Sequence, residues 1–151
     1  MDVVIGILGL AFALAVLAYA CFVLRRWVIA RRGGTFDCSL RIRPGGDPPP
    51  GPDLGQGWTL GTARYAEDML EWYRVFSFSP RPRWVFPRRE LEVRGRRVPD
   101  GPEALALLSG AVVLECRWRD QSVELAMADD ALTGFLAWLE SAPPGQHLDV
   151  A

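Results

Sequence analysis

The stretch GGTFDCSLRIRP, from Gly33 to Pro44, alternates polar and apolar side chains without interruption from Thr35 to Ile42. The apolar side chains belong to Phe36, Cys38, Leu40 and Ile42, and the polar ones to Thr35, Asp37, Ser39 and Arg41. Because successive side chains of a strand point to opposite faces, this pattern predicts a β-strand with one buried face. The strand begins shortly after a long hydrophobic run, so a β domain is expected to start almost where that run ends.

The hydrophobic run extends from Val3 to Leu24 and contains no charged residue. At a rise of ~1.5 Å per residue, a helix of this length spans ~33 Å, which exceeds the ~30 Å hydrocarbon core of a bilayer. A buried helix of a soluble protein rarely stays apolar on every face for so long. The run therefore predicts a transmembrane helix, with residues 1–26 as the membrane anchor.

A cleaved signal peptide is the alternative explanation for an apolar N-terminal segment. Ala18-Tyr19-Ala20 resembles a small-x-small cleavage site, and Cys21 follows it. However, Asp2 stands where signal peptides carry basic residues, and the apolar run continues beyond Cys21 to Leu24. We therefore expect the segment to be retained, with Cys21 as a small apolar residue of the span.

Basic residues flank this span on one side only, where they are Arg25, Arg26, Arg31 and Arg32. Asp2 is the charged side chain on the other side. Because basic flanks are retained in the cytoplasm, we expect a single-pass protein of the plasma membrane. Its N-terminus would face outward, residues 27–34 would form a basic juxtamembrane segment, and the C-terminal domain would be cytoplasmic.

The formal net charge of the 151-residue chain is −1, but the charge is unevenly distributed. Residues 25–97 include 15 Arg and 8 acidic residues, whereas residues 98–151 include 2 Arg and 9 acidic residues. A chain with a pI near 5.8 and a membrane anchor is a poor candidate for binding nucleic acid. The basic half lies next to the predicted span, so an anionic membrane surface suits it better.

Beyond the span, the chain alternates short apolar segments with turns and ends in one helical segment. Strands are expected at Thr35–Ile42, Trp58–Tyr65, Met69–Ser79, Arg83–Pro87, Leu91–Arg94, Ala111–Trp118 and Ser122–Met127. The Pro/Gly-rich stretch 44–57 predicts a loop. The helical segment repeats apolar residues at the spacing of one helix face and stops at Pro143-Pro144; these residues are Leu132, Phe135, Leu136 and Leu139. Residues 35–142 would form one domain, followed by a polar tail at 143–151.

Seven strands followed by an amphipathic helix indicate a mainly-β domain after the N-terminal transmembrane helix. A small β-barrel of about seven strands, capped by the C-terminal α-helix, would give each apolar stripe a partner and leave no open sheet edge. This is the element order of pleckstrin-homology-like domains, and a barrel of this class is the fold we predict. An unrelated α+β sandwich is the alternative.

Four separated motifs resemble the actinobacterial "domain of unknown function" family 2550, and the resemblance covers nearly the whole chain. The motifs are GGTFDCSLR, GWTLGTARY, LEWYRVFS and ELAMADDALTGFLAWLES. The resemblance implies a small membrane protein with a single N-terminal span and no established catalytic residues. It also implies a membrane-energetics setting, because members of that family tend to be encoded near ATP synthase genes.

The sequence offers little material for catalysis or for binding a cofactor or metal. The single His, His147, lies in the polar tail, and Cys38 and Cys116 are isolated from each other along the chain. Zinc needs three or four nitrogen or sulfur ligands, which these residues do not supply. HExxH, CxxC, GxSxG and P-loop motifs are absent. We therefore expect a binding protein without cofactors, not an enzyme.

The stretch RPRWVFPRRELEVRGRRV, from Arg81 to Val98, is the strongest candidate for an anionic-lipid site. It is expected to form a basic hairpin that carries Arg81, Arg83, Arg88, Arg89, Arg94, Arg96 and Arg97. An Arg close to an anionic leaflet contributes ~1 kcal/mol, and the interleaved Trp84 favours the interface. The simpler interpretation is an ordinary solvated hairpin whose charge is balanced elsewhere in the fold.

A tethered protein-interaction domain at the inner face of the membrane is the function we favour from sequence, with lipid binding as the alternative. Pleckstrin-like barrels often bind peptides or partner subunits, although fold alone does not assign function. A basic partner, such as part of a membrane protein complex, could face the acidic residues of the C-terminal half. These residues are Glu115, Glu124, Asp129 and Asp130.

Overall fold

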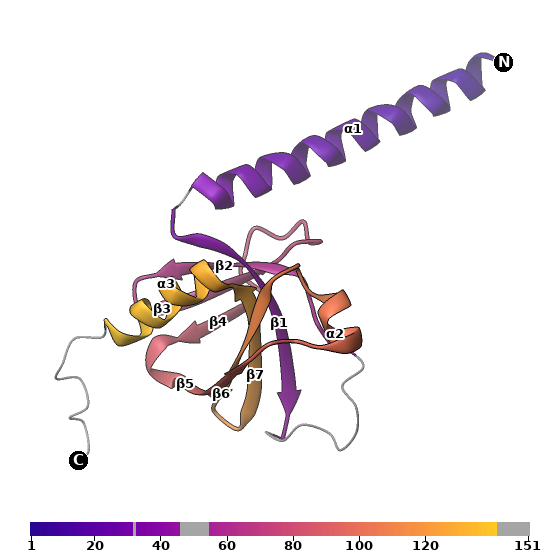
Figure 1. Cartoon of the computed structure of the whole chain (residues 1–151). Coiled ribbons are helices and arrows are strands. Elements are labelled where there is room, and N and C mark those ends of the chain that lie inside the picture. The colour runs from indigo at the N-terminus through magenta and orange to yellow at the C-terminus, as the bar shows by residue number, and fades with distance from the viewer. Residues whose placement is uncertain (32, 46–54, 142–151) are drawn as a thin grey trace.

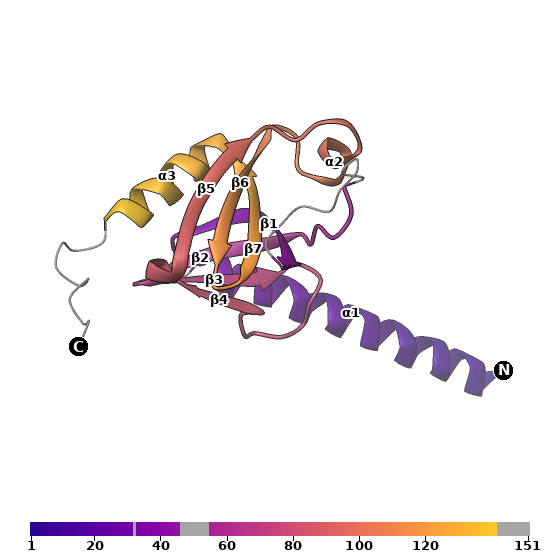
Figure 2. The same cartoon turned by 90° about the horizontal axis from the view of Figure 1, so that it is seen from below.

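The computed structural model describes residues 1–31, 33–45 and 55–141 (Figure 1). Arg32, most of the Pro/Gly-rich loop, Pro143-Pro144 and the tail with His147 lie outside the described residues. A long N-terminal helix, α1, projects away from a β domain, and a C-terminal helix, α3, lies across one end of the strands (Figures 1 and 2). The order of a long apolar helix, strands and a final helix is as predicted.

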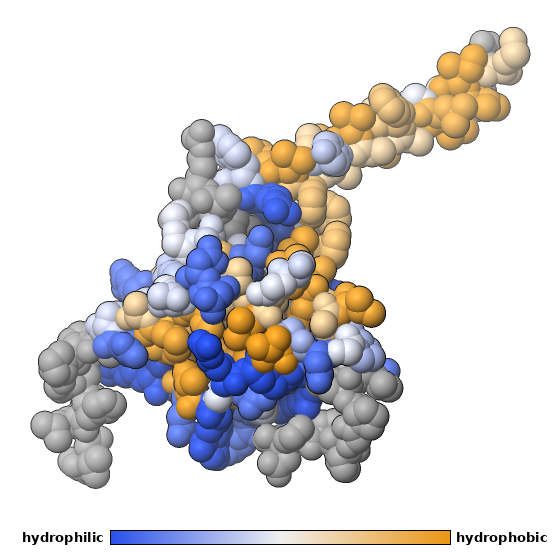
Figure 3. Space-filling model, viewed as in Figure 1, coloured by the Kyte–Doolittle hydropathy of each residue, from blue (hydrophilic) through white to orange (hydrophobic). Residues whose placement is uncertain are grey.

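Helix α1 (Asp2–Arg31) contains an apolar section, Val4–Trp27, that is long and apolar enough to cross a membrane. This section is not buried inside the structure, and Figure 3 shows that its surface is apolar along most of its length. Nothing in the sequence breaks the helix at Leu24. The chain instead turns at Gly33 and Gly34, which both have positive φ angles, so the helix extends into the predicted juxtamembrane segment.

The seven strands form one antiparallel sheet in the order β4-β3-β2-β1-β7-β6-β5. Their bounds are β1 Thr35–Pro44, β2 Gly61–Ala66, β3 Met69–Arg74, β4 Trp84–Pro87, β5 Leu91–Arg97, β6 Ala111–Trp118 and β7 Gln121–Ala128. A 3-10 turn (Arg88–Glu90) joins β4 to β5, and α2 (Gly101–Ala106) lies between β5 and β6. The prediction of seven strands is confirmed.

Strand β1 belongs to both halves of the sheet. Its first residues, Thr35–Asp37, pair with β2, and the remainder, Cys38–Pro44, pairs with β7. Cys38 and Leu40 are fully buried, as the alternating pattern predicts, and Phe36 and Ile42 pack partly buried against the same core. The strand that follows α1 along the chain is therefore the strand on which both halves of the sheet are built.

The sheet does not close, so the predicted barrel is wrong in this respect. Strands β4 and β5 are its two edges, and they pair with β3 and β6 but not with each other. The predicted Arg-rich hairpin is therefore also absent. The Trp118 ring on β6 lies 5.0 Å from the Phe86 ring and 6.1 Å from the Trp84 ring on β4. Aromatic side chains, which keep backbones farther apart than the ~4.8 Å of paired strands, thus join the edge strand β4 to β6, the neighbour of the other edge strand.

Two strands are shorter than the sequence predicts. Strand β2 begins at Gly61, where a Cβ would clash with the ring of Trp72. Strand β3 ends at Arg74 because Arg74 pairs with Gly61, the first residue of β2. The residues after Arg74 therefore leave the sheet as a loop, although their aromatic content predicts a strand as far as Ser79.

Helix α3 (Asp129–Glu140) covers one end of the core (Figure 2). Leu132 and Phe135 are fully buried, and Leu136 and Leu139 pack partly buried against the same cluster, so the predicted apolar face is confirmed. The cluster itself includes Cys38, Leu40, Leu70, Trp72, Phe86, Leu114, Val123, Leu125 and Met127.

We expect Phe135→Ala to lower the free energy of unfolding by about 3–5 kcal/mol, because a buried ring would be replaced by a cavity. The measurement is urea unfolding of the full chain in detergent, followed by tryptophan fluorescence. Glu140→Ala, on the exposed side of the same helix, is the matched control and should change stability by less than about 0.5 kcal/mol. Equal losses in the two variants would contradict the packing of α3.

Candidate functional site

A cluster of buried charges lies inside the β domain, and it centres on Arg41 of β1. Only 3% of Arg41 is exposed, and its guanidinium donates to both carboxylate oxygens of Glu124 on β7, at 2.6 and 2.9 Å. It also donates to Glu103 on α2, at 2.8 Å. The guanidinium stacks on the ring of Trp58, 4.4 Å from the centroid, and the indole N–H of Trp58 donates to Glu103.

Arg97 of the edge strand β5 completes this cluster. It donates to Glu124 at 2.9 Å, to both carboxylate oxygens of Glu103, and to Glu115 on β6 at 3.0 Å. These hydrogen bonds hold the pKa of the Glu103 carboxyl below its ordinary value. Arg43 is also paired to Glu124, and these ion pairs connect β1, β5, β7 and α2.

The internal cluster therefore uses residues that the sequence suggested for external contacts. Glu124 is only 4% exposed, so it cannot face a basic partner as we expected. Glu115 already forms an ion pair with Arg97. Asp129 and Asp130 do lie exposed at the start of α3.

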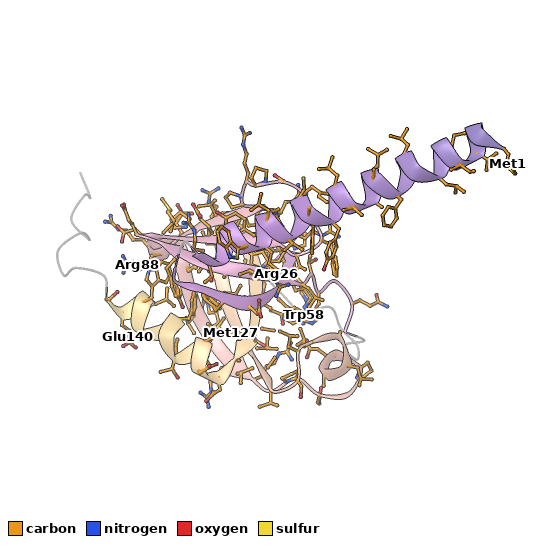
Figure 4. All side chains as sticks on the ribbon, turned by 90° about the horizontal axis from the view of Figure 1, so that it is seen from above. Met1, Arg26, Trp58, Arg88, Met127 and Glu140 are labelled. Atoms are coloured by element: carbon orange, nitrogen blue, oxygen red, sulfur yellow. The ribbon has the colours of Figure 1, made fainter. Side chains whose placement is uncertain are left out.

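Arg88 also has a structural role. It forms an ion pair with Asp68 in the β2–β3 turn, and it donates to the carbonyl of Trp138 at 3.0 Å and to the hydroxyl of Ser141 at 2.9 Å. The guanidinium lies 5.0 Å from the centroid of the Trp138 ring. Arg88 thus fastens the C-terminal end of α3 to the sheet, at the end of the domain where Figure 4 places both Arg88 and Glu140.

The remaining arginines of the predicted hairpin are exposed and dispersed. Arg94 pairs with its neighbour Glu92, whereas four others form no ion pair within the described part of the chain. These four are Arg81 and Arg83 in the β3–β4 loop, Arg89 in the 3-10 turn and Arg96 on β5. Because β4 and β5 do not pair, the seven arginines do not form one basic patch.

A second basic region lies where α1 meets the β domain. The Arg25 Nε atom donates to the carbonyl of Ser79 at 2.8 Å, and a terminal nitrogen of Arg25 donates to the carbonyl of Arg74 at 3.4 Å. One turn earlier in α1, the Phe22 ring contacts the Phe78 ring edge-on, with centroids 6.4 Å apart. The β3–β4 loop is thereby attached to the end of α1, as Figure 1 shows.

A cavity of about 220 Å³ opens between α1 and strands β1–β3, and we call it the junction cavity. Its polar lining consists of Arg25, Arg26, Thr35, Asp37, Thr62, Tyr73 and Arg74. Arg26 and Arg74 form no ion pair with any described residue, and Figure 4 shows Arg26 above the sheet near the end of α1. Three guanidinium groups around one carboxylate suit a small anion, because guanidinium binds phosphate and carboxylate oxygens through several donors.

The thiols and acids offer no alternative site within the described residues. No group of three His, Cys, Asp or Glu that could hold a metal occurs among them. Burial raises the pKa of Cys116 to about 12 and also raises the pKa of Cys38, so neither thiol forms a thiolate near neutral pH.

A family model described as "Protein of unknown function (DUF2550)" matches residues 12–145, which is most of the chain. The chain belongs to the DUF2550 family. It is 33% identical over 147 residues to the uncharacterized protein ML1147 of Mycobacterium leprae, covering 95% of this chain and 90% of that protein. It is 35% identical over 147 residues to the uncharacterized protein Rv1312 of Mycobacterium tuberculosis, covering 95% and 89%. The resemblance inferred from the four motifs is confirmed.

Sequence reasoning found only part of the junction cavity of this DUF2550 chain. It identified Arg25 and Arg26 as flanks of the span, but it missed Asp37 and Arg74. A signal for Asp37 exists, because it is a polar residue at the start of the strand that follows the span. Arg74 reaches the cavity through the pairing of β3 with β2 and of β2 with β1, which has no local signature.

We expect Arg41→Met to lower the free energy of unfolding by about 3–5 kcal/mol, because it removes the charge that compensates two buried carboxylates. Arg96→Gln, an exposed arginine without an ion pair in the described chain, should change it by less than about 0.5 kcal/mol. Urea unfolding of the full chain in detergent measures both. A silent Arg41→Met variant would show that the buried cluster does not hold the domain together.

Proposed function

We propose that this chain is a single-pass protein of the plasma membrane whose C-terminal domain is a cytoplasmic binding domain and not an enzyme. The apolar section Val4–Trp27 has the length of a membrane span, and the basic residues that follow it favour retention of that side in the cytoplasm. The N-terminus would then face outward.

We further propose that the β domain is related to the pleckstrin-homology-like class. Two observations support this: the strand order, in which β1 joins β2, β3 and β4 on one side to β7, β6 and β5 on the other, and the helix α3 across one end of the core. The open edge between β4 and β5 is compatible with such a fold, which consists of two half-sheets packed together.

The function that the geometry supports best is binding of an anionic lipid headgroup in the junction cavity. The observation that carries this proposal is the position of Arg25, Arg26 and Arg74 around one cavity at the end of an apolar helix. A cavity of about 220 Å³ is smaller than the ~300–1,000 Å³ typical of drug-sized ligands and suits a phosphate-bearing headgroup. Because the span would hold the cavity at the bilayer surface, even weak intrinsic affinity would give occupancy.

The test uses the full chain in detergent, titrated with phosphatidylglycerol or phosphatidylcholine and observed by native mass spectrometry. We expect the wild-type chain to retain phosphatidylglycerol preferentially. Arg26→Gln combined with Arg74→Gln should weaken that binding roughly 30-fold, since each Arg contributes ~1 kcal/mol. Both side chains are exposed, so the fold should persist.

The matched control is Arg94→Gln combined with Arg96→Gln, which removes the same charge from exposed positions on β5. Equal weakening in the two double variants would show that the effect is general electrostatic attraction. Equal retention of the two lipids by the wild-type chain would reject the headgroup site altogether.

Binding of a protein partner is the second candidate function, and a different surface favours it. The connection between β5 and β6 exposes three large apolar side chains: Val98 is 77% exposed, Leu105 is 89% exposed and Leu108 is 52% exposed. Exposed apolar side chains grouped on one segment are typical of interaction surfaces. A partner could bury them while the domain stays attached to the membrane.

We expect Leu105→Ser to abolish recovery of such a partner when the full chain is purified from cross-linked membranes. Thr133→Ser, an exposed position on α3, is the control and should leave recovery unchanged. Recovery that is identical in the two variants would mean that this surface does not hold the partner.

A further inference from the structure

The loop between β3 and β4, residues 75–83 (VFSFSPRPR), exposes two aromatic rings. Phe76 is 73% exposed and Phe78 is 70% exposed, whereas Ser77 between them is half-buried. The usual arrangement of polar residues outside and apolar residues inside is reversed here. Single exposed apolar residues are common on protein surfaces, but the ring of Phe78 contacts Phe22 of the apolar helix α1, whose apolar surface Figure 3 shows.

The contact between Phe22 and Phe78 sets the depth of this loop relative to α1. The apolar section Val4–Trp27 has 24 residues and spans ~36 Å as a helix, whereas the hydrocarbon core of a bilayer is ~30 Å thick. Counted from Val4, the core would end near residue 23. Phe22 then lies just inside the hydrocarbon, Arg25 lies at the headgroups, and Phe78 is next to Phe22.

Unpaired N–H groups are costly where water is scarce. The N–H groups of Phe76, Ser77 and Phe78 have no hydrogen-bond partner among the described residues, so this part of the backbone requires the hydrated headgroup level, whereas the rest of the loop is paired. The N–H groups of Ser79 and Arg81 donate to the hydroxyls of Ser77 and Ser79. Positions 80 and 82 are Pro, which has no N–H. At the two ends of the loop, the N–H group of Val75 donates to the carbonyl of Leu60, next to β2, and that of Arg83 donates to the carbonyl of Trp72 on β3.

The charged residues of the loop also suit a position at the level of the lipid headgroups. Arg81 and Arg83 follow the two Phe residues, and both are exposed without an ion pair in the described chain. Long Arg side chains can keep their charge among phosphates while the adjoining residues contact apolar groups. Arg25, which holds the loop through the carbonyl of Ser79, lies at the same level.

We propose that residues 75–83 form a second membrane contact, in which Phe76 and Phe78 insert at the boundary between headgroups and hydrocarbon. Arg81 and Arg83 contact the phosphates of the same leaflet. The inference rests on the proposed membrane span of α1. Two contacts, the span and this loop, prevent the β domain from rotating about α1, and they hold the mouth of the junction cavity at the level of the phosphates.

The experiment places an environment-sensitive fluorophore on single cysteines of the full chain in liposomes. The background is Cys21→Ala, because Cys38 and Cys116 are buried. Labels are attached through Ser79→Cys in the loop, Leu14→Cys in the span and Asp120→Cys in the β6–β7 turn. Quenching of each label is then measured with nitroxide-bearing phospholipids and, separately, with a water-soluble quencher.

We expect the label at position 79 to lose emission with shallow lipid nitroxides and to resist the aqueous quencher. The label at 120 should behave in the opposite way, and the label at 14 should respond to deep lipid nitroxides. In the Phe76→Ser/Phe78→Ser background, the label at 79 should become accessible from water. Circular dichroism checks that this variant remains folded.

Each outcome separates the two proposals. If the label at 14 lies in lipid but the label at 79 is aqueous, the loop inference is wrong while the span remains. If the label at 14 is itself aqueous, the proposed span fails and the loop inference fails with it. If the label at 79 stays in lipid without the two Phe residues, its position comes from α1 alone, and insertion of the aromatic rings is rejected.

Discussion

The short connection between α1 and β1 is the constraint on which the rest of this structure depends. The helix ends at Arg31 and the strand begins at Thr35, so four peptide steps, at most about 14 Å, separate the two elements. A domain attached in this way cannot leave the end of the helix. Since β1 also pairs with both β2 and β7, the position of this one strand orients both halves of the sheet.

The buried charge cluster then fixes the arrangement of one half of the sheet, β1-β7-β6-β5, together with α2. Arg41 on β1 and Arg97 on β5 share Glu103 and Glu124, and the four side chains come from separate elements. Hydrophobic packing tolerates many alternatives, whereas a buried carboxylate needs a particular donor at a particular distance. The cluster therefore specifies how α2 and the edge strand β5 sit on the sheet, beyond any stability that it contributes.

The distribution of arginines has a consequence for function. Arginines inside the fold serve packing, as Arg41, Arg88 and Arg97 do, and those around the end of α1 are available to an external anion. Phe78, one of the two exposed aromatic residues of the β3–β4 loop, lies next to Phe22 of α1. The arginines of the junction cavity and the exposed ring of Phe78 thus both lie near the apolar helix. A bilayer surface would accommodate this arrangement.

The sequence by itself determined the local features of this protein. The long apolar helix follows from an uninterrupted apolar run. The alternating strand at the start of the domain, the number of strands and the buried face of α3 follow from periodicity and turn residues, which depend on neighbouring positions. The tertiary structure alone decided which charges are buried and whether the sheet closes. Arg41 meets its carboxylates across 62 and 83 residues, and no local pattern distinguishes it from an exposed polar residue of a strand. Arg96 and Arg97 are adjacent in the sequence, but the alternation of β5 places one outward and the other in the cluster, because a strand points successive side chains to opposite faces.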